Sequence, residues 1–283
     1  MEKLRVFVIT QEEPFYLPKM IRHLIDCQND TYEVVGATRL KPHRKNKSMK
    51  HWLQERTRIY TWWELSLAGA LFVWTKLIRR WWSKLSGSTP YSVRNAYQRA
   101  GIVEIDTVDL NAPDYVAQVK ALQPHIILSI SPPQLFKEEL LAAASRYCLN
   151  AHGTLLPRHR GVFGSWWTIY EQDQEAGGTI HTMELKLDAG EILWQEAFPV
   201  EKDDTQYSIA RKTKGAMSAA LPKLMRAIAH GEEQAKPVQY SSSYHRAPTR
   251  ELGKAFHQAG HRVITLRDVR LRTCGQLPEN TVR

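Results

Sequence analysis

Short apolar runs alternate with segments of helical spacing along most of this chain, and this pattern predicts an α/β fold. Residues 4–10 (Leu-Arg-Val-Phe-Val-Ile-Thr) and 32–38 are predicted strands. Apolar residues at helical spacing predict a helix over 14–27 between them. A strand, a helix and a strand at this spacing begin a parallel sheet with right-handed crossovers.

The same alternation returns after residue 90 and extends the predicted sheet. We expect helices over 91–100, 114–122, 138–147 and 205–230, a short helix ending near residue 260, and strands over 102–105, 126–130, 148–151, 179–185 and 192–199. The fold predicted is an open, mostly parallel, Rossmann-like sheet with helices on both faces. Gln11-Glu12-Glu13-Pro14 follows the first strand where a dinucleotide site would have a glycine-rich loop, so such a site is not expected.

Residues 41–90 interrupt this alternation with a basic and aromatic insertion. Six of the nine tryptophans lie here: Trp52, Trp62, Trp63, Trp74, Trp81 and Trp82. Residues 41–84 also hold eleven Lys or Arg against two Glu, a net charge of +9, while the whole chain carries +10. The rest of the chain is therefore almost neutral.

Three interpretations of the insertion are open. Its apolar run over 65–74 is about half of the roughly 20 residues needed to span a bilayer, so a transmembrane helix is not expected. The composition favours a helix lying on an anionic membrane surface. The tryptophans could instead pack on the body of the protein or against a second subunit in a homodimer. A nucleic-acid partner, whose bases would stack on Trp and Arg, is the least favoured.

Candidate chemistry lies between residues 148 and 193. Asn150 and His152 are two apart on an extended segment, so their side chains project from the same face. Gly153 lets the chain turn, and Asp188 follows in Leu-Asp-Ala-Gly-Glu-Ile. An amide, an imidazole and a carboxylate can together hold an oxyanion and move a proton. An Asn-x-His pair on its own more often caps a turn.

The order of motifs over residues 122–199 makes the site more specific. Asn-x-His precedes Leu155-Leu156-Pro157, Arg160-Gly161, a tryptophan-rich helix, Gly178-Thr179-Ile180-His181, and Leu-Asp-x-Gly-x-Ile, with 38 residues from Asn150 to Asp188. This arrangement resembles the catalytic core of the folate-dependent formyltransferases. That family includes enzymes acting on methionyl-tRNA, glycinamide ribonucleotide and amino sugars.

The resemblance implies a donor, a catalytic triad and a binding pocket. The donor would be 10-formyltetrahydrofolate, and no metal is implied. Asn150 and protonated His152 would stabilise the oxyanion, while Asp188 would orient His152 and help to remove the amine proton. The pterin ring of the donor would be lined by Gln134, Leu135, Phe136, Leu141 and Leu187, although an ordinary core role is equally expected for each apolar member. His181 is expected more often in the core or at the surface than in the site.

The sequence predicts an N-formyltransferase acting on a primary amine of a small or lipid-linked acceptor such as an amino sugar. Thr154, Gly178, Ala189 and Glu191 depart from the usual family pattern, which weakens any inference about the acceptor. The alternatives are a 10-formyltetrahydrofolate hydrolase, an enzyme that formylates an aminoacyl-tRNA, and a non-catalytic membrane-associated protein with the same fold.

The remaining expectations concern organisation and location. Residues 1–235 would form the catalytic domain with its insertion at 41–90, and residues 236–283 a small extension, shorter than the barrel domain of methionyl-tRNA formyltransferases. Cys27, Cys148 and Cys274 lack metal-ligand spacing and predict a reducing compartment. No secretory signal is recognised at Met1. We therefore expect a cytoplasmic protein, which would be peripheral at the inner face of the membrane if the insertion binds lipid.

Overall fold

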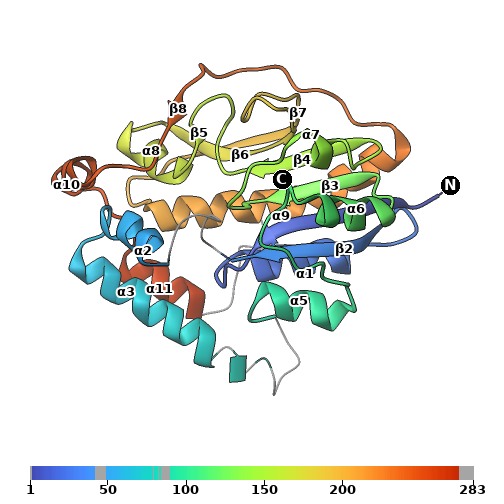
Figure 1. Cartoon of the computed structure of the whole chain (residues 1–283). Coiled ribbons are helices and arrows are strands. Elements are labelled where there is room, and N and C mark those ends of the chain that lie inside the picture. The colour runs from blue at the N-terminus through green and yellow to red at the C-terminus, as the bar shows by residue number, and fades with distance from the viewer. Residues whose placement is uncertain (1, 42–48, 79, 82, 84–89, 274–283) are drawn as a thin grey trace.

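A six-stranded sheet forms the centre of the protein, which is described by a computed structural model except at residues 1, 42–48, 79, 82, 84–89 and 274–283 (Figure 1). Its strand order is β2-β1-β3-β4-β6-β7, and β2, β1, β3 and β4 run parallel to one another. β6 pairs in antiparallel fashion with both β4 and β7. The bounds are β1 Leu4–Gln11, β2 Tyr32–Leu40, β3 Ile126–Ile130, β4 Tyr147–His152, β6 Glu175–Thr182 and β7 Ile192–Pro199. The predicted mostly parallel sheet is confirmed.

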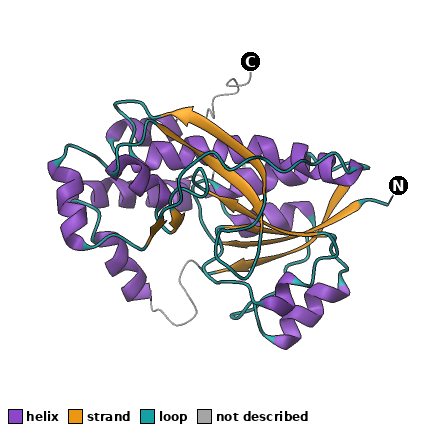
Figure 2. Ribbon diagram, turned by 90° about the horizontal axis from the view of Figure 1, so that it is seen from above, coloured by secondary structure: helices purple, strands orange, loops and turns teal. Residues whose placement is uncertain are grey.

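Helices cover both faces of this sheet, as Figure 2 shows from above. On β1, Val6 and Val8 enter a core formed with α1, α5 and α9, while Phe7 and Ile9 enter a second core with α6 and α7. Because side chains alternate along a strand, one buried strand supplies both cores. The helices are α1 Leu17–Asp26, α5 Val93–Ala100, α6 Pro113–Ala121, α7 Glu138–Leu141 and α9 Gln206–His230.

Two predicted elements differ from the structure. The helix expected over 138–147 ends at Leu141, because the amides of Arg146 and Tyr147 bond to the carbonyl of His125 and direct the chain into β4. The strand expected over 102–105 is reduced to one bridge between Ala37 and Glu104. Helical or apolar character in a short segment does not reveal where tertiary hydrogen bonds will redirect the backbone.

The insertion forms α2 (Met49–Thr57), α3 (Trp62–Val73) and a π-helical turn η1 (Trp74–Ile78). Thr61 and Glu64 begin α3 with reciprocal side-chain to backbone bonds, which satisfy its first free amides. Among the residues that the structure describes, no helix is both long enough and apolar enough to cross a bilayer.

The C-terminal helices α10 (Arg250–Gln258) and α11 (Leu266–Thr273) pack against the insertion, and Figure 1 shows α11 beside α3. The buried carboxylate of Glu64 accepts a 2.7 Å hydrogen bond from the amide of Val263. Leu67, Leu71 and Ile264 form a small apolar cluster at the same contact. The insertion and the C-terminal segment therefore support each other.

Candidate functional site

The candidate site lies at the carboxyl end of β4, where ligands collect in open parallel sheets. Asn150 and His152 lie on the same face of this strand, as the sequence spacing predicted. His181 lies on β6 directly opposite Asn150 in the antiparallel pairing of these strands. The pairing of β4 with β6 therefore brings His181 next to Asn150 and His152, which lie 29 or more residues before it in the sequence.

Asp188 reaches the site from the loop between β6 and β7. The loop is closed by two 2.8 Å hydrogen bonds between Thr182 and Glu191. A Cβ atom at Gly190 would lie 1.8 Å from the carbonyl oxygen of Thr182, so glycine is required for this close approach. The Asp188 backbone has a left-handed φ of 50°, and its Oδ2 accepts a 3.0 Å hydrogen bond from the amide of Gly161.

These elements bring the predicted triad together. Oδ1 of Asp188 lies 3.8 Å from Nδ1 of His152 and 3.9 Å from Nε2 of His181. Nδ2 of Asn150 lies 3.2 Å from the same His181 nitrogen. His181, for which a core or surface position was the stronger expectation, is therefore a buried member of the cluster. Only the register between β4 and β6 could have shown that His181 lies in the site.

Hydrogen bonds fix the orientation of the Asn150 amide. The Ser129 hydroxyl donates to its Oδ1 at 3.0 Å, which leaves Nδ2 facing His181. Nδ1 of His181 lies 2.7 Å from the carbonyl oxygen of Thr182 and must carry the proton of that bond, because a carbonyl only accepts. Nε2 of neutral His181 is then free to accept from Asn150. The amide has a second N–H, which remains to be used by a ligand.

The charge state of His181 follows from its surroundings. Burial and, after it, nearby His152 lower the pKa of His181, Asp188 and the hydrogen bond to the Thr182 carbonyl oppose them, and the resulting pKa is about 4. His181 is therefore neutral at pH 7. Only the neutral ring can accept the hydrogen bond from Asn150, so burial and hydrogen bonding both favour the neutral form of His181.

The cluster brings an oriented amide donor (Asn150), an imidazole (His152) and a carboxylate (Asp188) close together. The His152 side chain is 12% exposed and that of Asp188 is 6% exposed, so solvent or substrate reaches the imidazole more readily than the carboxylate. Nε2 of His152 lies 3.3 Å from the carbonyl oxygen of His159, in the loop that also carries Gly161. This arrangement can hold a developing oxyanion and accept a proton.

The five residues expected around the donor ring occupy different environments. Leu135 and Leu187 are exposed, whereas Phe136 is buried and Leu141 packs against the same core. The Gln134 side chain bonds to the backbone at Val108 and Leu110. Leu135 and Leu187 are thus open to a ligand, while Phe136 and Gln134 mainly support the loop around them.

Lys214 is a further group at the same edge of the sheet, and no motif in the sequence indicated it. From α9, its ammonium group donates a 2.6 Å hydrogen bond to the hydroxyl of Ser131, directly after β3. Burial lowers the pKa of Lys214 to about 8, while Glu13 opposes the shift. Only the folded chain brings this long helix to the end of β3.

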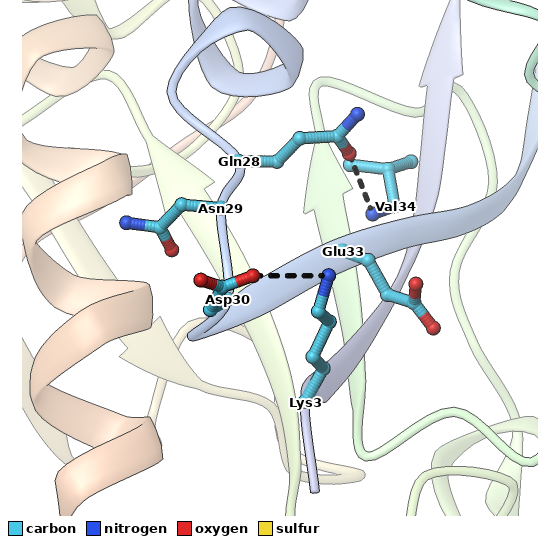
Figure 3. A pocket seen from close by; sticks show the side chains of 6 residues that line it. All are labelled: Lys3, Gln28, Asn29, Asp30, Glu33 and Val34. Carbon is cyan, nitrogen blue, oxygen red and sulfur yellow. Dashed lines mark hydrogen bonds and ion pairs between the residues drawn. The ribbon is translucent and has the colours of Figure 1, made fainter.

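A separate hollow of about 290 Å³ lies at the other end of the strands (Figure 3). It is lined by Lys3, Gln28, Asn29, Asp30, Glu33 and Val34, with an ion pair of 3.7 Å between Lys3 and Asp30. These residues precede or begin β1 and β2. The hollow is therefore remote from the polar cluster at the carboxyl end of β4.

Comparison with known proteins points to one family for the region that contains the cluster. The model of the family described as "Formyl transferase" matches residues 87–225. The methionyl-tRNA formyltransferase of Lysinibacillus sphaericus is 38% identical over 116 residues, which cover 41% of this chain and 37% of that protein. The matching segment thus spans little more than a third of this relative.

Solved structures resemble a larger part of the chain. Phosphoribosylglycinamide formyltransferase from Anaplasma phagocytophilum aligns with 86% of this chain and 100% of its own, with a TM-score of 0.57 and 16% identity. A sugar 3N-formyltransferase solved in the presence of dTDP and 5-N-formyl-THF aligns with 86% of this chain and 69% of its own, with a TM-score of 0.54 and 16% identity. At these identities the likeness concerns the fold.

Proposed function

Because residues 87–225 place this chain in the formyl transferase family, we propose that it moves a formyl group from 10-formyltetrahydrofolate to the nitrogen of a primary amine. The family resemblance inferred from the motifs is confirmed by this match. The proposal rests on one observation, the convergence of Asn150, His152 and Asp188 from β4 and the β6–β7 loop.

The cluster can serve each step of this transfer. The neutral amine attacks the formyl carbon, and the oxyanion that develops receives hydrogen bonds from the Asn150 amide and protonated His152. Asp188 holds the imidazole and accepts the proton that the amine loses, directly or through water. The carbon–nitrogen bond of the donor then breaks, its nitrogen takes up a proton, and a formamide and tetrahydrofolate leave.

The donor is proposed to bind beside the Asp188 loop. Leu135 and Leu187 expose apolar side chains on the two loops next to the cluster, which suits an aromatic ring. The sugar 3N-formyltransferase described above was solved with 5-N-formyl-THF, which supports a folate donor. None of these steps needs a nucleophile from the protein, and burial raises the pKa of the Cys148 thiol to about 12, which makes it unreactive.

The acceptor is proposed to be a lipid-linked amine such as an amino sugar carried by a lipid. The N-terminus of a helix after the first strand often binds phosphate. At the N-terminus of α1 the Glu13 carboxylate already accepts from the amides of Tyr16 and Leu17, so this helix end is not open to the phosphate of a nucleotide-linked acceptor. The aromatic insertion lies close to the site, because the Arg56 guanidinium is 5.6 Å from the ring centre of Phe163, two residues after Gly161.

Formyl transfer is tested by mass spectrometry. The protein is incubated with 10-formyltetrahydrofolate and amino sugars, nucleotide-linked amino sugars or lipid extracts, and we expect one acceptor to gain a single formyl group. The Asn150→Ala variant should form this product at a rate lower by about 100-fold or more, since one oxyanion donor contributes about that much.

Formate release provides the contrasting result. Release of formate without any added amine, at a rate that no acceptor changes, would identify a hydrolase and overturn the transfer proposal. Equal product formation by the Asn150→Ala variant would show that the reaction occurs elsewhere. Glu184→Gln, which changes an exposed side chain of the β6–β7 loop, is the matched control.

We further propose that the exposed side of α3 binds an anionic phospholipid surface. Trp62 is 87% exposed and Trp63 is 62% exposed at the start of α3, whereas Leu67 and Leu71 further along the helix are buried. A helix that is apolar on all sides requires cover for both faces. The exposed basic residues Lys50, Arg58 and Arg80 and the net charge of the insertion favour anionic lipid as that cover.

Vesicle sedimentation tests this surface. The unaltered protein should sediment with phosphatidylglycerol-containing vesicles and bind vesicles of phosphatidylcholine alone more weakly. Trp62→Ser with Trp63→Ser should weaken binding about tenfold or more, because each large apolar side chain removed from water contributes about 1.5–3 kcal/mol. Val238→Ser, at an exposed apolar position in the C-terminal segment, is the matched control.

Two results would contradict the lipid proposal. Equal vesicle binding by the double variant and the unaltered protein would exclude these tryptophans as the contact. A homodimer that dissociates in the double variant, together with no vesicle binding by the unaltered protein, would assign the face to a second subunit.

A further inference from the structure

Three side chains with metal-binding atoms meet outside the proposed catalytic cluster. His159 precedes β5 (Arg160–Gly161), His245 ends β8 (Tyr244–His245), and Glu171 follows α8 (Gly164–Tyr170). The parallel pairing of β5 with β8 brings the two histidines together. One ligand atom from each residue lies within 4.8 Å of the other two.

The distances between these atoms are close to those of a metal site. Nε2 of His245 lies 3.3 Å from Oε1 of Glu171, and Nδ1 of His159 lies 3.8 Å from Oε2. Ligand atoms about 2.0–2.1 Å from a tetrahedral zinc ion are about 3.3 Å apart. The two histidine nitrogens, within 4.8 Å of each other, therefore need to approach by at most about 1.5 Å.

The two histidine nitrogens that face this space are buried, and among the described residues they make no hydrogen bond of acceptable geometry, only the ion-pair contacts with Glu171. Such orphaned atoms are rare in folded proteins and call for an explanation. The His159 side chain is only 2% exposed, so water has little access to its nitrogen. A bound cation would satisfy both nitrogens at once.

The other nitrogen of His159 is already fixed. Nε2 lies 2.6 Å from Oδ2 of Asp173, and a carboxylate can only accept, so Nε2 carries the proton in the neutral ring. The lone pair of that ring is then at Nδ1, facing His245 and Glu171. A carboxylate behind a histidine ligand is the usual support of a metal-binding imidazole. Arg158, 3.0 Å from Oδ1, holds Asp173 in turn.

We propose that His159, Glu171 and His245 bind a divalent transition-metal ion, for which zinc is the best match. Two imidazoles and one carboxylate form a ligand set that suits zinc, with a water molecule as the fourth ligand. Glu171 is 39% exposed, which gives the ion and this water a route from solvent. The sequence predicted no metal because the ligands lie 12 and 74 residues apart.

The ion would fasten the C-terminal segment to the loop that supports the catalytic cluster. The His159 carbonyl contacts His152, and the Gly161 amide contacts Asp188, so both ends of this short loop reach the triad. The backbone of His245 packs directly against this loop, since a Cβ atom added at Gly161 would lie 2.2 Å from the His245 carbonyl oxygen. The metal site itself does not depend on the proposed transfer reaction.

Zinc titration of the tag-free full chain, after dialysis against a chelator, tests this site. Calorimetry should report one Zn²⁺ bound per chain, and Tm should rise on zinc addition. His245→Gln and Glu171→Gln should each weaken zinc binding about 100-fold or more and abolish the rise in Tm. Glu171→Gln changes a partly exposed side chain, so it remains informative if His245→Gln does not fold.

Two control variants make the result specific. His230→Gln removes an exposed histidine at the end of α9 and should bind zinc as the unaltered chain does. His23→Gln removes a surface histidine whose ring lies 3.7 Å from the Cys27 thiol, the competing metal-binding pair. Loss of binding in His23→Gln but not in His245→Gln would overturn the proposal, and so would the absence of zinc binding by the unaltered chain.

Discussion

Asp188→Asn is expected to lower kcat for formyl transfer by about 10²–10⁴-fold, the range that a positioned acid–base group contributes. The carboxylate lies within ion-pair distance of His152. An amide of the same shape cannot stabilise the imidazolium or take the amine proton. The rate with saturating donor and acceptor measures this loss.

The substitution suits this position for structural reasons. Asp188 has a left-handed backbone, a conformation that asparagine adopts more readily than most residues. The asparagine oxygen can still accept from the Gly161 amide, so the loop contact is retained. A fall in kcat with unchanged Tm would therefore report lost chemistry rather than lost structure.

Glu191→Gln is the matched control, since it neutralises an exposed carboxylate three residues further along the same loop. It should change kcat by less than about twofold, because an exposed charge is screened by solvent. An Asp188→Asn variant that retains more than half of the kcat would remove Asp188 from the proposed mechanism.

The parts of the fold that the sequence predicted well are those governed by local periodicity. The strand over 192–199 and the helix after Thr205 follow directly from apolar spacing and an N-terminal cap. Asn150 and His152 share a face for the same reason, because side chains alternate along a strand. Local rules thus fix the elements and the direction of their side chains.

The parts that the sequence could not predict depend on contacts between distant segments. His181 joins the site through its register opposite Asn150, and Lys214 reaches Ser131 from a helix 83 residues away. The docking of Val263 on Glu64 likewise joins segments 199 residues apart. Periodicity defines the ends of an element but does not say which residues of another element will lie opposite.

His181→Gln is expected to flatten the dependence of stability on pH below neutrality. In the folded chain burial lowers the pKa of His181 to about 4, whereas an unfolded histidine titrates near 6.5. Between these values the unfolded chain binds more protons than the folded chain, so the free energy of unfolding falls as the pH is lowered from about 6.5 to about 4. Above that window neither state is protonated at this residue.

The size of this effect follows from linkage. A shift from 6.5 to about 4 corresponds to a loss on the order of 3 kcal/mol across the window, as one pKa unit is about 1.4 kcal/mol. Glutamine does not titrate, and its oxygen can still accept from the Asn150 amide. Urea unfolding at several pH values between 4 and 7.5 should therefore give a shallower slope for His181→Gln than for the unaltered chain.

His230→Gln should keep the slope of the unaltered chain, because this exposed histidine is solvated in both states. Parallel stability curves for His181→Gln and the unaltered chain would mean that His181 is protonated as readily in the folded protein as in the unfolded one. A protonated ring presents an N–H to the Asn150 amide and can no longer accept from it. The same measurement therefore tests whether a neutral His181 orients the Asn150 amide, which is proposed to donate a hydrogen bond to the oxyanion.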